Sequence, residues 1–174
     1  MTAPQPTSAV GPMTEANLAI ERWSATSGSG RDSRASVVLR GGGHRWRAHA
    51  DGNGAVDALM RAVDRALAPL LGAGVELATY EVHATGPGHD TAGAVAISLR
   101  GRGEEDAPLY PGRGVHDNIL EASLVAYVDG LSRLLADRGV DIAAAPAVAS
   151  ASDRTSDTDA RDRARERLMS AYNG

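Results

Sequence analysis

Two similar halves follow each other between residues 16 and 143, and this internal repeat constrains the fold more than any other feature of the sequence. At an offset near 60 residues, Gly52-Asn53-Gly54 aligns with Gly112-Arg113-Gly114, and Leu39-Arg40-Gly41 aligns with Leu99-Arg100-Gly101. A match at a near-constant offset over a whole half indicates that one structural unit was duplicated. Further matched pairs are Asp57 with Asp117, Leu59 with Ile119, Ala62 with Ala122, and Ala66 with Ala126.

Each half contains three stretches typical of strands, followed by one typical of a helix. In the first half, the apolar pattern predicts strands at 17–26, 36–40 and 44–50 and a helix from Ala55 to about Leu71. Pro69 lacks a backbone N–H, so we expect the last turn of that helix to be distorted. In the second half, strands are predicted at 77–85, 94–100 and about 107–111, and a helix follows Gly112-Arg113-Gly114 and ends at Gly139.

The stretch 77–85 alternates in the way expected of a half-buried strand. Tyr80, Val82 and Ala84 share one face, which we expect to be buried. The other face is polar and carries His83, which we expect to be solvated or to face a partner.

A three-stranded sheet with one helix is too small to be stable alone. We therefore predict an α+β fold in which two βββα units, 16–73 and 74–143, pack about a pseudo-twofold axis, with the sheets packed against the helices. Residues 1–15 read as a flexible lead and 144–158 as a linker of low complexity. Residues 159–174 form a charged terminal helix in this interpretation, either solvated or docked onto a partner, with an apolar stripe of Ala160, Ala164, Leu168 and Tyr172.

The composition excludes several classes of protein for this chain and disfavours others. It has no Cys, which excludes disulfide scaffolds, zinc ribbons and thiol catalysis. A net charge of −4 argues against nucleic-acid binding. No apolar run is long enough to span a membrane and the N-terminus lacks the features of a signal peptide, so we expect a cytoplasmic protein. With only six aromatic residues, the core is built from Val, Leu, Ile and Ala, which favours association into a homodimer.

The two G-x-G segments, each expected as a turn before a helix, are the most specific candidate sites. A turn of this kind presents free backbone N–H groups that suit a carboxylate. Simple turn geometry, in which Gly permits a positive φ, is the alternative reading.

These segments also resemble a known family. DGNGAVDALMRAV at 51–63, Tyr80, GHDTAG at 88–93 and GRGVHDNILEASLVAYVDGLSRL at 112–134 are similar to the C-terminal regulatory domain of α-isopropylmalate synthase. The resemblance covers about residues 17–138. It implies two βββα units, a dimer, and a site between units for the feedback inhibitor leucine; citramalate synthases use a similar domain to bind isoleucine.

The resemblance also implies which residues bind the effector. Loop N–H groups would hold its α-carboxylate, a side-chain or backbone oxygen its ammonium, and Val56, Leu77 and Ala84 its aliphatic side chain. The implied effector-binding residues are Gly52, Asn53, Gly54, Val56, Leu77, Tyr80, Ala84, Thr91, Gly93, Val115 and Asp117.

The chain departs from the family pattern at several places. Ala55 replaces a proline after the first G-x-G, and His116-Asp117-Asn118 replaces D-T-D after the second, which changes charge and hydrogen bonding in the implied pocket. The family's catalytic barrel holds a divalent metal partly through a His-x-His pair, and this chain contains no such pair. His44 and His49 stand five apart on a strand and are expected on opposite faces, so no metal pair is predicted.

Three functions remain open from the sequence. The first is a stand-alone regulatory domain that binds a leucine-like effector and acts on a separate catalytic barrel subunit, without a cofactor or metal and without synthase activity of its own. The second is a pocket recruited for a cyclisation, dehydration or isomerisation, with His116, Asp117, Tyr80 and His89 as the catalytic candidates. The third is a dimerisation or docking module that uses the charged C-terminal helix.

Overall fold

The computed structural model describes residues 17–88 and 90–145, which form two βββα units. The first unit contains β1 (Ala19–Gly28), β2 (Arg31–Gly41), β3 (His44–Gly52), α1 (Ala55–Ala66) and the short α2 (Ala68–Leu71). The second contains β4 (Val75–Ala84), β5 (Gly93–Gly101), β6 (Tyr110–His116) and α3 (Ile119–Asp137). The predicted α+β fold is confirmed. The lead at 1–15, the C-terminal helix at 159–174 and most of the linker at 144–158 lie outside the described residues.

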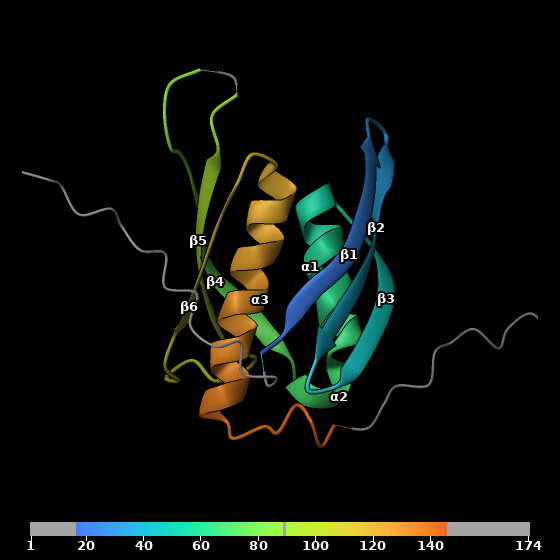
Figure 1. The fold of residues 1–174 in the computed structure, drawn as a ribbon, viewed down its shortest axis with the longest axis vertical. Helices are drawn as coiled ribbons and strands as arrows, with labels where there is room; N and C mark the ends of the chain where they lie inside the picture. The colour runs from blue at the N-terminus through green and yellow to red at the C-terminus, as the bar shows by residue number, and fades with distance from the viewer. Residues whose placement is uncertain (1–16, 89, 146–174) are drawn as a thin grey trace, which may run out of the picture.

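The two sheets are antiparallel, with strand orders β1-β2-β3 and β4-β5-β6. Figure 1 shows the sheets on the outside of the molecule and α1 and α3 between them, each helix packed on the sheet of its own unit. Strand alternation directs one row of each sheet toward the helices. In the first unit this row includes the paired residues Leu39 and Trp46, which are both fully buried.

A hydrogen bond links the two units where α1 packs against α3. The Tyr127 hydroxyl donates to the Asp64 carboxylate over 2.7 Å. Burial raises the pKa of Asp64 above its ordinary value, against the opposing influence of the Tyr127 hydrogen bond and the positive charge of Arg102. Burial likewise raises the pKa of Tyr127, with a further contribution from Asp64. This polar contact lies within an otherwise apolar seam.

The helix ends agree with the sequence-based expectations. The first helix breaks at Leu67, and Pro69 stands in the first turn of α2, as its missing donor predicts. Gly139 follows α3 with φ of 63°, a left-handed conformation that favours glycine and ends the helix. Among the described residues, no helix combines the length and apolar character needed to cross a membrane.

Two expectations about the strands of the second unit are wrong. The last strand of the second unit is not at 107–111 but at Tyr110–His116, because β6 continues until the turn before α3. The face of β4 that carries Tyr80, Val82 and Ala84 is exposed, although the alternation itself is as predicted. The reason is tertiary, because α3 covers β5 and β6 and leaves the edge strand β4 uncovered.

Candidate functional site

One end of the molecule gathers most of the residues implied as a site. Both α1 and α3 begin at this end, and the hairpin between β4 and β5 extends beyond it (Figure 1). Gly52, Asn53 and Gly54 precede α1, Val115 and Asp117 precede α3, and Thr91 lies in the hairpin. Leu77 is the exception, because it lies near the opposite end of β4.

The start of α1 presents unpaired backbone donors. Gly54 is the N-cap residue and provides no side-chain hydrogen bond, so the N–H groups of the first turn have no capping acceptor. Asn53 differs, because its N–H donates to the Asp57 carboxylate over 3.0 Å. Partial burial favours the neutral form of Asp57, but hydrogen bonds from Arg61 and from the Asn53 N–H outweigh it and lower the pKa of Asp57.

The second G-x-G does not form the predicted turn before α3. Gly112 and Gly114 lie within β6 and face α3 so closely that a Cβ would collide with the carbonyl oxygens of Ala126 and Ala122. Glycine is needed there to let the helix backbone approach the strand. The turn before α3 is instead His116-Asp117-Asn118, so Asn118 rather than Gly114 corresponds to Gly54.

The start of α3 is capped by its own side chains. The Asn118 side chain accepts a hydrogen bond from the Leu120 N–H over 3.0 Å. His116 Nδ1 accepts from the Asn118 N–H over 2.9 Å, so in the neutral ring the proton is on Nε2. Asp117 is exposed beside it. A catalytic role for His116 and Asp117 stays a prediction, and His89 lies outside the described residues.

Tyr80 is anchored to α3. Its hydroxyl lies 2.7 Å from Ser123 Oγ, and Ser123 donates its own proton to the Ile119 carbonyl, so Tyr80 is the donor in this pair. At the start of β5, a Cβ on Gly93 would stand 2.7 Å from Ile119 Cδ1. The end of the Ile119 side chain therefore occupies the space beside Gly93.

The hairpin that follows β4 is held by threonines. The Thr85 hydroxyl donates to the Ala92 carbonyl over 2.9 Å and lies 3.3 Å from the Thr91 hydroxyl. Thr91 and Gly93 are half-buried, whereas Ala84 is exposed.

The described histidines do not form a metal site. His44 and His49 lie on opposite faces of β3, as predicted. They pair in regular register with Gly41 and Ser36 of β2, so the alternation of faces is unbroken between them. His83 is exposed on the polar face of β4 beside Glu81. Within residues 17–88 and 90–145, no group of three His, Asp or Glu side chains is arranged to hold a metal ion.

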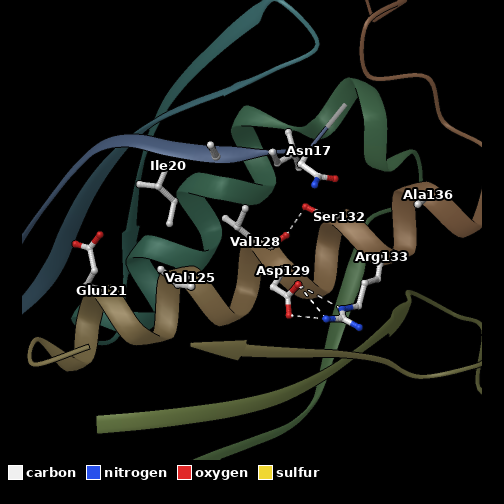
Figure 2. A pocket seen from close by; sticks show the side chains of 11 residues that line it. Asn17, Ile20, Glu121, Val125, Val128, Asp129, Ser132, Arg133 and Ala136 are labelled. Atoms are coloured by element: carbon white, nitrogen blue, oxygen red, sulfur yellow. Dashed lines mark hydrogen bonds and ion pairs between the residues drawn. The ribbon is translucent and has the colours of Figure 1, made fainter. Parts of the chain in front are cut away.

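A groove that the sequence reasoning missed runs along the outward side of α3. It has a volume of about 530 Å³ and lies between α3 and the start of β1 (Figure 2). Ile20, Val125 and Val128 give it an apolar floor, and Glu121, Asp129 and Arg133 lie along it. In the sequence, Val125 was the available signal for this groove, because it is an apolar residue outside the buried side of the helix. In the structure, the Val125 side chain is 37% exposed.

Comparison with known proteins identifies the family. The model of the LeuA allosteric (dimerisation) domain matches residues 7–135. The chain is 36% identical over 110 residues to a 2-isopropylmalate synthase of Nitrosospira multiformis, covering 63% of this chain and 20% of that protein. It is 42% identical over 96 residues to the 2-isopropylmalate synthase of Xanthomonas campestris pv. campestris strain B100, covering 55% of this chain and 17% of that protein.

The chain spans about a fifth of the length of these relatives. The family match, in contrast, extends over most of the chain and includes both βββα units as far as the last turn of α3. This chain therefore belongs to the LeuA allosteric (dimerisation) domain family.

Proposed function

We propose that this domain binds a small branched-chain amino acid at the end where α1 and α3 begin, and that binding regulates a catalytic partner of the 2-isopropylmalate synthase type. The observation that carries the proposal is the first turn of α1, whose N–H groups lack a side-chain cap in a domain of an allosteric family. An α-carboxylate is a suitable acceptor for such donors.

The two helix starts differ in what they offer a zwitterion. The α1 start has unpaired donors for the carboxylate, whereas the α3 start is already capped by Asn118 and offers the exposed Asp117 carboxylate for the ammonium. The half-buried Val56, in the first turn of α1, is an apolar contact for the aliphatic side chain.

Leu77 belongs to another surface in this proposal. Leu77 and Ala84 pair with Leu99 and Gly93, six residues apart on β5, so at about 3.3 Å per residue they lie about 20 Å apart. One amino acid does not contact both residues within one chain. We assign Leu77 to the surface through which the domain associates.

That surface is the uncovered face of β4, through which we propose that two copies form a homodimer. Leu77, Tyr80 and Val82 are 37%, 36% and 45% exposed, and all three lie on the side of the sheet that is buried over β5. An exposed apolar row on an edge strand is a surface that association covers. The family description, which includes dimerisation, supports the same assignment.

Regulation would follow from a difference in affinity between two states of the partner. An effector shifts an equilibrium only by the ratio of its affinities for those states. The domain therefore acts if its ligand-bound form contacts the partner differently from its free form.

Calorimetry with leucine, isoleucine and valine tests the proposal. We expect saturable binding of at least one of them, and a loss of affinity of about tenfold in Asp117→Asn, since a charge-assisted hydrogen bond is lost. Asp106→Asn, in the loop at the opposite end of the molecule, is the matched control and should bind normally. Absence of binding by all three amino acids to folded protein would rule out this function.

A further inference from the structure

The groove along α3 is shaped to receive a helix. Its lining residues follow α3 from Glu121 to Ala136, a length of about 22 Å at 1.5 Å per residue, with β1 forming the opposite wall (Figure 2). The floor is apolar at Ile20, Val125 and Val128 and narrows to the small residue Ala136. Grooves of this kind bind amphipathic helices through apolar residues spaced three or four apart.

Near its end, the described chain passes one end of this groove. The Asn17 carbonyl oxygen, Leu18 Cδ2 and Ile142 Cγ2 all stand within 3.3 Å of the position that a Cβ on Gly41 would occupy. Asn17 and Leu18 line the groove, and Ile142 and Ala145 are packed into the core three residues apart. The chain then continues to Gly174.

The sequence of that continuation matches the groove in both pattern and charge. At 100° per residue, Ala160, Ala164 and Leu168 fall on one stripe. On the same projection Arg167 borders the stripe on one side and Arg161 and Arg165 on the other, whereas Asp162, Glu166 and Asp159 fall opposite it. The groove carries two carboxylates, Glu121 and Asp129, and one guanidinium, Arg133, which pairs with Asp129.

We propose that residues 159–172 of this chain dock as a helix in the groove, antiparallel to α3. As a helix, the segment from Ala160 to Tyr172 measures about 18 Å and fits within the groove. Because the chain emerges at the Asn17 end, the antiparallel direction places the small residues Ala160 and Ala164 beside Ala136 and Ser132. The same direction seats Leu168 on the apolar floor, where the arginines along one border of the stripe lie beside α3 and its carboxylates.

Introduced cysteine pairs test this proposal, because the natural chain contains no Cys. The full-length variant Ser132→Cys/Ala164→Cys brings the two thiols to adjacent positions in the docked arrangement. The control is Ser132→Cys/Glu166→Cys, whose second thiol stands at nearly the same distance along the chain but on the opposite side of the stripe. Both pairs benefit from the same tether, so we expect the first to oxidise within the chain about tenfold faster or more.

Two further variants tie the rate to the apolar contact. Adding Leu168→Asp to the first pair should reduce its rate to that of the control, whereas Met169→Asp, off the stripe, should leave it unchanged. Equal rates for the two pairs, insensitivity to Leu168→Asp, or disulfides that form mainly between chains at high dilution would each overturn the proposal.

Discussion

The two βββα units have the same order of elements, but their first strands are buried to different extents. In the first unit, the helix-facing row of β1 packs on the core, and the Trp23 indole N–H donates to Glu121 of α3 in the other unit. In the second unit, the corresponding row of β4 is exposed at Tyr80 and Val82. One copy of the repeat therefore closes the domain, while the other leaves an apolar strand available to a partner.

The helices also approach their sheets differently. Ala50 and Gly114 each stand four residues before the N-cap of their helix and face it, but only the first carries a Cβ. α3 lies close enough to β6 for its carbonyl oxygens to fill the space of that Cβ. Duplication kept the topology, while the spacing between helix and strand diverged at this position.

The largest expected effect on stability comes from adding a Cβ at the close contact between Gly114 and α3. Gly114→Ala should destabilise the fold by about 3 kcal/mol or more, since the added Cβ collides with the backbone of α3. Gly54→Ala is the matched control, because nothing lies within 4 Å of the new Cβ and φ of −148° is ordinary. We expect that control to cost about 1 kcal/mol or less, because alanine is only a somewhat poorer N-cap than glycine. Urea denaturation measures both, and similar losses in the two variants would contradict the packing argument.

The difference between β1 and β4 is tested by the oligomeric state. Val82→Asp places a charge in the exposed apolar row and should weaken the proposed dimer about 100-fold, because an unpaired charge would be buried on association. His83→Asp adds a carboxylate to the opposite face of the same strand and should leave the dimer intact. Sedimentation velocity over a concentration series reports the dissociation constants. A dimer that tolerates Val82→Asp does not use this face of β4.

The raised pKa of Asp64 sets the expected sign of a pH dependence in the seam between the units. Burial raises the pKa of Asp64 in the folded protein above its unfolded value of 3.8. At a pH below that value the carboxyl is neutral in both states, but as the pH rises through the folded pKa the unfolded state is favoured. Asp64→Asn retains an acceptor for Tyr127 and removes this loss, so its stability relative to wild type should rise from pH 3 to pH 7. Urea unfolding at the two pH values gives this difference, and a constant one would refute the assignment.

The smallest effect concerns the two helix starts. Asn118→Ala removes the cap of α3 and should cost about 1 kcal/mol, whereas Gly54→Asn adds a cap to α1 and should gain a few tenths of a kcal/mol. Thermal unfolding of both variants measures the asymmetry. If Gly54→Asn is strongly destabilising, the start of α1 is not the open set of donors described above.

Periodicity was enough to predict the architecture, because most of the core is local to each unit. The apolar spacing in α1 and α3 and the alternation in β2 and β5 give the helices and strands and their buried faces. Pro69 and Gly139 mark helix ends for reasons that act within a few residues. β2, however, begins at Arg31 rather than 36, because its polar first residues pair with β1 by backbone hydrogen bonds.

The site was harder to predict because its geometry depends on contacts between segments. Aligning the two glycine pairs by identity placed Gly112 and Gly114 in a turn, although they serve the close packing of α3 on β6. Val115 and His116 still belong to β6, and α3 begins only at Ile119. Tyr80 is exposed because α3 does not cover the edge strand of the sheet. The alternation of residues along one strand does not predict how far a helix covers the sheet.

The shared direction of α1 and α3 has an electrostatic consequence. Each helix has about half a positive elementary charge at its first turn, so two like poles lie at the same end of the molecule (Figure 1). Asp57 and Glu121, in the first turns, neutralise part of this charge. An anion that arrives there relieves the remaining repulsion, so occupancy of that end and cohesion between the helices reinforce each other.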